Sequence, residues 1–324
     1  MTQAGGAGYI TADRCEQIQA VRNSKSNGNF AIGQDIANLG VVPMDANQDF
    51  CVYNSAELHL LADVQGVFGP SGSLAFSPLN AARFDTRRGA KPSAGTVIEV
   101  PTGAPAGTPA VLVNLTMTEA ETAGYITADR CSALRSRTGD PQFSNGNYVA
   151  GQNIANLAVV PVDSNGSFCV FVSSRVNVVA DVQGRFATGG AYRFTLTPNV
   201  RTDTRSGPKP TARSKVRAAT GLPAGTPYAL VNLTMTQAGG GGYITAGPCS
   251  TVDALAANQS NGNFRFGADI ANLGVVALDP DGGFCVFVET PVHLVIDVQG
   301  SFSSTGHLGF DSVGSLRQLD SRQG

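Results

Sequence analysis

The sequence predicts an all-β protein made of tandem β-sandwich domains of the jelly-roll type, with one disulfide in each. Three observations predict this class. A unit of about 117 residues repeats along the chain, short apolar runs alternate with turn residues, and the six cysteines fall two to a repeat.

The repeat is visible in several motifs. Gly-Tyr-Ile-Thr-Ala occurs at 8–12, 124–128 and 242–246, and Ser-Asn-Gly-Asn, Phe-Cys-Val and Asp-Val-Gln-Gly each recur three times. The period suits a whole domain and exceeds that of solenoid repeats. We therefore expect units at 1–84, 85–202 and 203–319, with 320–324 beginning a fourth.

The two ends of the chain are out of register with the repeat. Residues 1–4 match 235–238, so the first unit lacks about 32 residues that open the second. This pattern indicates a window from a longer tandem array. It also raises the hypothesis that a strand from another chain completes the first unit by β-strand addition.

Strand signals dominate each unit. The run 111–118 is rich in β-branched residues and is bounded by turn residues, and 155–162 and 176–182 are further apolar runs. The turn at 163–166 between two such runs predicts a hairpin. Only 249–257 favours a short helix, so the elements predict a sandwich.

The cysteines can pair in two ways that treat the units alike. We expect each unit to close its own pair, because small secreted domains usually do so. Pairs across units, or buried reduced cysteines, remain alternatives. No Cys-x-x-Cys or repeated His suggests a metal, and we expect no cofactor. The cysteines are Cys15, Cys51, Cys131, Cys169, Cys249 and Cys285.

Composition excludes several classes of protein. Charged residues are 14% of the chain, against roughly 25% in ordinary soluble proteins. The net charge of -2 argues against a nucleic-acid partner, which needs a basic face. No apolar run is long enough to predict a membrane helix, and 42% hydrophobic residues is too many for a disordered chain.

The motifs do not predict an enzyme. His59 and His293 share a position that is Asn177 in the second copy, which excludes a Ser-His-Asp triad in every unit. No phosphate-binding loop is present in the sequence.

The most specific polar signal is Asp-(Thr/Ser)-Arg near each unit boundary. An Arg can form a bidentate pair with a carboxylate, so we interpret this motif as a structural latch, with a ligand-binding Arg as the alternative. The latch residues are Arg83, Asp85, Arg87, Arg201, Asp203, Arg205, Asp320 and Arg322.

The Ser-Asn-Gly-Asn motif suits a tight turn. Its asparagines could alternatively bind sugar hydroxyls. The candidate glycan-binding residues are Asn27, Asn29, Asn145, Asn147, Asn261 and Asn263.

In this order, the motifs resemble tandem repeats of secreted and cell-surface proteins of actinobacteria and related bacteria. Arg-x-x-Asp-Thr-Arg, Ser-Asn-x-Asn, Ala-Asn-Leu and Asp-Val-x-Gly-x-Phe carry the resemblance over essentially the whole chain. Gln65 and the residue before Phe68 depart from the pattern. The resemblance implies secretion and a β domain, and it implies no catalytic residues.

The sequence thus predicts a secreted, non-catalytic structural or adhesive protein with units arranged end to end. It would form a spacer, surface layer or filament by association with like units. The alternative is an array of carbohydrate-binding modules whose partner is a cell-wall glycan.

Overall fold

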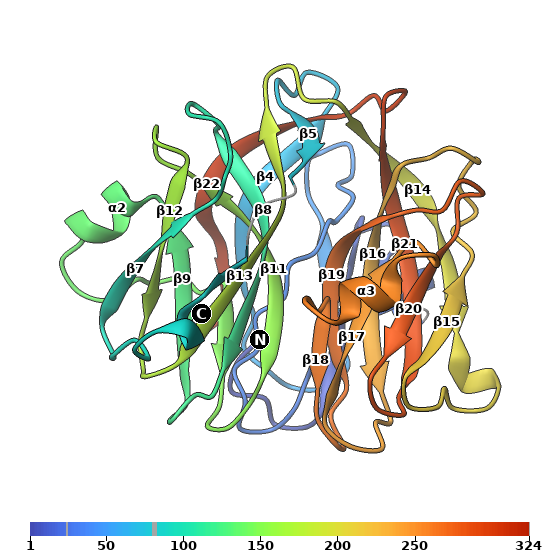
Figure 1. Ribbon diagram of the computed structural model, residues 1–324, viewed down its shortest axis with the longest axis horizontal. Helices are drawn as coiled ribbons and strands as arrows, with labels where there is room; N and C mark the ends of the chain where they lie inside the picture. Colours follow the sequence, from blue (N-terminus) through green and yellow to red (C-terminus); the bar gives the residue numbers. More distant parts are fainter. Residues whose placement is uncertain (24, 80–82, 324) are drawn as a thin grey trace.

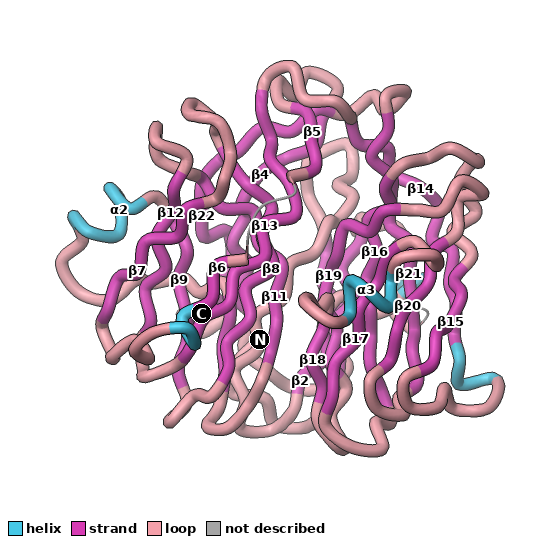
Figure 2. Tube along the Cα trace, viewed as in Figure 1, coloured by secondary structure: helices cyan, strands magenta, loops and turns pink. Residues whose placement is uncertain are grey.

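The computed structural model describes residues 1–23, 25–79 and 83–323. Its regular structure is almost entirely antiparallel strands, which confirms the predicted all-β class (Figure 2). The strands form three sandwiches placed around a shared centre. In Figure 1 the second sandwich (green) lies at the left, the third (orange) at the right, and the first (blue) behind them.

The first sandwich combines the two ends of the chain. It comprises β1 (Gly8–Asp13), α1 (Ile18–Val21), β2 (Gly28–Phe30), β3 (Cys51–Asn54), β4 (Leu61–Gly69) and β22 (Gly309–Asp320). Its sheets are β2-β1-β3 and β22-β4.

The second sandwich contains two larger sheets, β10-β9-β12-β7 and β11-β8-β13-β5, and β6 also pairs with β13. Its elements are β5 (Ala75–Pro78), β6 (Phe84–Asp85), the 3-10 helix η1 (Thr86–Arg88), β7 (Thr96–Pro101), β8 (Ala110–Thr118), β9 (Gly124–Asp129), α2 (Cys131–Ser136), β10 (Gly146–Tyr148), β11 (Ile154–Pro161), β12 (Ser167–Val172) and β13 (Asn177–Ala187).

The third sandwich repeats this arrangement with the sheets β14-β21-β16-β19 and β15-β20-β17-β18. Its elements are β14 (Arg193–Asp203), the 3-10 helix η2 (Thr204–Ser206), β15 (Ser214–Ala218), β16 (Tyr228–Thr236), β17 (Gly242–Gly247), α3 (Val252–Ala256), β18 (Gly262–Phe264), β19 (Ile270–Ala277), β20 (Phe284–Val288) and β21 (His293–Ser303).

The predicted hairpin at 163–166 is wrong. The turn exists, because Gly166 N–H donates to the carbonyl of Asp163 over 2.9 Å. However, β11 before it pairs with β8, and β12 after it pairs with β7 and β9 in the opposite sheet. Both strands are buried on both faces, so each takes a central or covered place in its own sheet and the turn connects the two layers.

Strand β8 explains how the sandwiches and the centre are linked. Val113, Leu115 and Met117 face the core of the second sandwich, whereas Leu112 on the opposite face joins a central cluster. In the third sandwich β16 divides its side chains in the same way. This double burial accounts for the lack of clean polar alternation in these runs.

At the middle of the central cluster, six phenylalanines pack in a near-threefold arrangement. The equivalent rings of Phe68, Phe186 and Phe302 lie 6.0, 6.0 and 6.2 Å apart. A second equivalent set, Phe76, Phe194 and Phe310, packs on them at 4.4 to 4.7 Å. The sandwiches therefore surround one shared core, which differs from the end-to-end arrangement expected from the sequence.

Each sandwich takes a strand that enters from the preceding repeat. The strand before each Asp-(Thr/Ser)-Arg motif pairs with the sheet that follows it, as β14 does with β21. The last such strand, β22, pairs with β4 near the start of the chain. This pairing closes the three sandwiches into a ring.

Candidate functional site

The six cysteines form three disulfides, one in each sandwich. They join Cys15 to Cys51, Cys131 to Cys169 and Cys249 to Cys285. Each bond ties the segment after the Tyr-Ile-Thr-Ala strand to the Phe-Cys-Val strand, which confirms the pairing expected within each unit.

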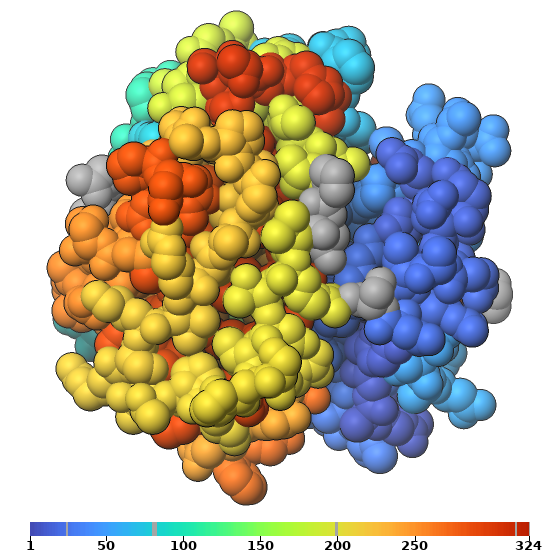
Figure 3. All heavy atoms as spheres, turned by 90° about the vertical axis from the view of Figure 1, so that its right-hand side faces the viewer, coloured from blue at the N-terminus to red at the C-terminus, as the bar shows by residue number. Residues whose placement is uncertain are grey.

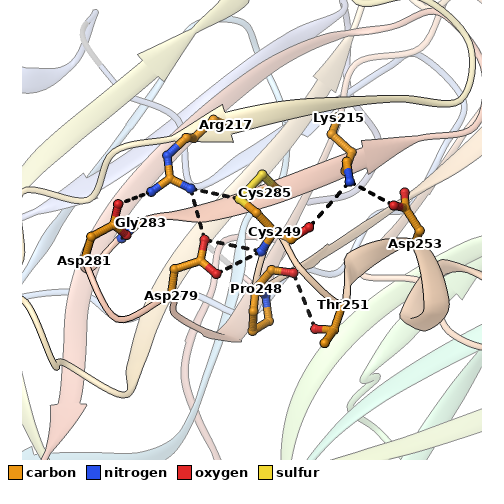
Figure 4. The surroundings of a disulfide bond; sticks show 10 residues. All are labelled: Lys215, Arg217, Pro248, Cys249, Thr251, Asp253, Asp279, Asp281, Gly283 and Cys285. Atoms are coloured by element: carbon orange, nitrogen blue, oxygen red, sulfur yellow. Dashed lines mark hydrogen bonds and ion pairs between the residues drawn. A yellow bond between two sulfur atoms is a disulfide. The ribbon is translucent and has the colours of Figure 1, made fainter.

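Figure 4 shows the disulfide of the third sandwich inside an ion-pair cluster. Arg217 on β15 pairs with Asp279 at 3.0 Å and with Asp281 at 2.5 Å. Asp279 also accepts from the backbone N–H of Cys249 at 3.0 Å. The cluster thus binds the turn before β20 to the half-cystine on the neighbouring loop.

The two latch arginines that precede a triplet, Arg83 and Arg201, contact the aspartates of Asp-Val-Gln-Gly rather than the adjacent triplet. Arg83 donates to Asp181 through Nε at 2.7 Å and through Nη2 at 3.1 Å. Arg201 makes the same bidentate contact with Asp297, at 2.7 and 3.0 Å. Both pairs fasten an incoming strand to the central strand of its sheet.

The third pair was missed from the sequence. Arg317 is bidentate to Asp63, which joins the end of the chain to its beginning. Arg317 precedes Asp320 by three residues, whereas the other two arginines precede their Asp by two. The register of β22 shifts between Arg317 and Leu319, so an extra residue bulges out and the arginine regains the equivalent place.

Within the triplet, the Asp and the second Arg bind each other. Asp85 caps η1 by accepting from Arg87 N at 3.0 Å, and it holds the Arg87 guanidinium at 2.6 Å. Asp203 and Arg205 repeat this arrangement. In the first sandwich, Asp320 accepts from Arg322 N at 3.1 Å and from the Arg322 guanidinium at 2.5 Å.

The middle residue of the triplet bonds to the next sheet. Thr86 Oγ1 accepts from Val178 N at 2.9 Å, Thr204 Oγ1 from Leu294 N at 2.8 Å, and Ser321 Oγ from Leu60 N at 2.8 Å. The shared His/Asn position contacts the same hydroxyls, through His59, Asn177 and His293. The shared His/Asn position therefore contributes to the contact between each triplet and the sheet that follows it.

The latch perturbs the protonation of its carboxyl groups. The side-chain hydrogen bond from Arg87 lowers the pKa of Asp85, and Arg205 and Arg322 lower the pKa of Asp203 and Asp320 in the same way. Burial raises the pKa of Asp181, against the opposing effect of Arg83. The carboxylates of the triplets therefore favour the charged form. For the buried carboxyl of Asp181, the charged form depends on its contact with Arg83.

The candidate glycan-binding asparagines are engaged inside the protein. Asn27, Asn145 and Asn261 each accept from a backbone N–H of the Tyr-Ile-Thr-Ala strand at 2.7 Å. Their partners at 29, 147 and 263 accept from the motif's serine, over 3.4, 2.9 and 3.2 Å. The motif braces its own turn, which matches the turn interpretation.

A further polar network lies between the sandwiches. Asn156 Oδ1 accepts from Leu39 N at 3.2 Å, and Asn272 Oδ1 accepts from Leu157 N at 3.0 Å. Gln65 and Gln183 accept from backbone amides of the next sandwich at 3.0 and 3.4 Å. These residues lie in apolar strands, where only their recurrence in each copy could have drawn attention to them.

Two members of this network are unsatisfied. Among the described residues, Asn38 Oδ1 and Gln299 Oε1 are buried without a hydrogen-bond partner, whereas their equivalents in the other sandwiches are bonded. Asn38 belongs to the first sandwich and Gln299 to the third. The interface between these two, seen side by side in Figure 3, therefore lacks bonds that the other two interfaces have.

One cluster of potential metal ligands occurs in the described part of the chain, formed by Glu99, Cys131 and Cys169. Both sulfurs are consumed in a disulfide, so this cluster offers a single carboxylate. Among the described residues, no helix has the length and apolar character to span a membrane.

No family model matches this chain, and no curated protein matches it either. Solved structures resemble it only weakly. The structure described as "Crystal Structure of the STIV MCP" has 9% identity and a TM-score of 0.21, covering 72% of this chain and 98% of that one. The CBM22-1-CBM22-2 tandem domain from Paenibacillus barcinonensis Xyn10C has 13% identity and a TM-score of 0.20, covering 76% and 99%.

Proposed function

We propose that this protein is a non-catalytic extracellular structural module whose three sandwiches act as one rigid block. The observation that carries the proposal is the use of the repeated polar motifs. The arginine–aspartate pairs and the Ser-Asn-Gly-Asn asparagines, which recur in all three sandwiches, bind within the protein itself. Side chains used in this way maintain shape rather than handle a substrate.

The disulfides support an extracellular location. Disulfides persist in oxidising compartments and are rare in the cytosol of most organisms. A loop of this length stabilises the fold by about 3 to 4 kcal/mol in the chain-entropy model. We therefore propose that the protein is secreted or displayed at the cell surface.

Exposed apolar side chains support an adhesive role. Ile32 and Phe266 are 67% and 75% exposed, and they occupy the same turn in the first and third sandwiches. A cavity of about 480 Å³ beside Phe266 is lined by equivalent segments of all three sandwiches, among them 36–38, 154–155 and 268–271. Exposed apolar groups at one end of a rigid block suit association with like copies.

Sedimentation velocity and negative-stain electron microscopy over a concentration series would test this role. We expect ordered assemblies that are lost in the double variant Ile32→Ser, Phe266→Ser. Val313→Ser is the matched control, because Val313 is 47% exposed on a different strand, β22. A monomer at every concentration would overturn self-assembly, and specific retention on a cell-wall glycan array would favour the carbohydrate-binding alternative.

A further inference from the structure

The second and third sandwiches carry opposite charges beside equivalent disulfides. Cys169 lies directly opposite Glu99 of the edge strand β7, and Cys285 lies directly opposite Arg217 of the edge strand β15. The two strands occupy the same place in their sheets, so Glu99 and Arg217 are equivalent residues. The repeat therefore keeps the cysteines but reverses the charge that accompanies them.

In the third sandwich the neighbouring group donates a hydrogen bond to sulfur. Arg217 Nη1 lies 2.9 Å from Cys249 Sγ (Figure 4). The same nitrogen donates to Asp279 at 3.0 Å, and Nη2 donates to Asp281 at 2.5 Å. The two carboxylates thus hold the guanidinium in place while one N–H of Nη1 is directed at the sulfur. This donor would stabilise a sulfur that gains negative charge.

In the second sandwich the neighbouring group is an acceptor. A carboxylate oxygen of Glu99 lies within 4.8 Å of both Cys131 Sγ and Cys169 Sγ. Arg135 binds this carboxylate at 2.8 Å, which holds a negative charge beside the disulfide. A carboxylate cannot donate to sulfur and repels a thiolate, so it disfavours any step that places charge on these atoms.

A second cation accompanies Arg217. Lys215 Nζ lies 3.5 Å from the carbonyl oxygen of Cys249 and 2.8 Å from Asp253, whereas the equivalent residue of β7 is Val97. Because three carboxylates surround these two cations, the cluster as a whole carries no excess of positive charge. The contrast between the two sandwiches therefore lies in the group nearest to sulfur, a donor in the third and an acceptor in the second.

The two disulfides also differ in access. Cys131 and Cys169 are 4% and 0% exposed, and Leu134 of α2 packs against them. Cys249 is only half-buried, and the side chain of Arg217 beside it is 48% exposed. The disulfide of the third sandwich therefore lies nearer the surface, next to the group that would stabilise its thiolate.

We propose that the Cys249–Cys285 disulfide is a site of exchange with external thiols, and that Arg217 activates it. A thiolate attacks Cys249 Sγ, the bond to Cys285 breaks, and Cys285 leaves as a thiolate. The second thiol of a dithiol then attacks the mixed disulfide and releases the Cys249 thiolate, which accepts from Arg217. The dithiol is oxidised to a disulfide, and its two protons pass through water to the two cysteines. The second sandwich keeps its cross-link.

The test compares two disulfides within the native chain. Dithiothreitol is added without denaturant, and free cysteines are trapped with N-ethylmaleimide at timed points and located by peptide mass spectrometry. We expect Cys249 and Cys285 to be trapped on the order of tenfold sooner than Cys131 and Cys169. Equal rates would mean that both bonds open only by global unfolding, and this result, or faster opening of the second sandwich, would overturn the proposal.

Arg217→Gln isolates the effect of the guanidinium. It should slow the opening of Cys249–Cys285 about tenfold, because the departing charge loses its donor. A merely structural role predicts the opposite sign, since the loss of a brace would expose the disulfide and speed its reduction. Arg213→Gln is the matched control for net charge, because Arg213 is an exposed arginine in the turn before β15, and it should leave the rate unchanged. An unchanged or faster rate in Arg217→Gln would overturn the assignment.

Discussion

The first and third sandwiches carry the same motifs but bury them to different extents. Leu294 in β21 is fully buried, whereas its equivalent Leu60 beside β4 is only half-buried. Strand β20 is buried throughout, whereas β3 is half-buried or exposed along its whole length. The difference shows that the shared motifs alone do not determine how completely a sandwich buries its strands.

The largest expected loss of stability comes from a substitution in the phenylalanine core that the sandwiches share. Phe302→Ala should destabilise the protein by about 4 kcal/mol, because the ring is 2% exposed and packs on four other phenylalanines. Differential scanning calorimetry should show separate transitions for the sandwiches. Phe264→Ala, within the core of the third sandwich alone, is the control and should leave their coupling intact.

A matched leucine pair measures the difference in packing directly. Leu294→Ala should cost about 3 kcal/mol and Leu60→Ala about 1 kcal/mol, because the second side chain leaves a smaller cavity. Urea unfolding followed by a probe in each sandwich would check this. Equal losses would mean that the first sandwich is packed as tightly as the third.

The Arg–Asp pair of the third sandwich should contribute more to stability than the Arg–Asp pair of the first. Arg201→Leu leaves Asp297, which is 3% exposed, without its bidentate partner and should cost about 2 kcal/mol. Arg317→Leu leaves the more exposed Asp63 and should cost about 1 kcal/mol. A double-mutant cycle with Asp297→Asn would separate pairing from packing, and a coupling energy near zero would contradict the latch.

The smallest effect concerns pH. Asp85, Asp203 and Asp320 have lowered pKa values in the folded state. Their contribution is therefore present above the unfolded pKa of roughly 3.9 and is lost as pH falls through the folded value. Arg322→Gln should move acid unfolding of the first sandwich to higher pH, as measured by circular dichroism, and leave the third unchanged.

Much of the fold was predictable because the same sequence motifs recur in each of the three repeats. The β class, the disulfide pairing and the arginines at 83 and 201 follow from local motifs. The ring does not, because Phe68, Phe186 and Phe302 resemble ordinary core residues and nothing local places them together. Arg317 escaped because a bulge shifts its spacing, and the predicted hairpin failed because the runs around 163–166 are buried on both faces and enter different sheets.

The pairing of β22 with β4 sets an order on folding during synthesis. The first sandwich receives its closing strand only after residues 309–320 have left the ribosome. At 5 to 20 residues per second, β4 waits roughly 10 to 50 s for its partner. The second and third sandwiches contain all their strands in sequence and can fold earlier. Of the three sandwiches, the one whose synthesis begins first is therefore expected to be the last to become stable.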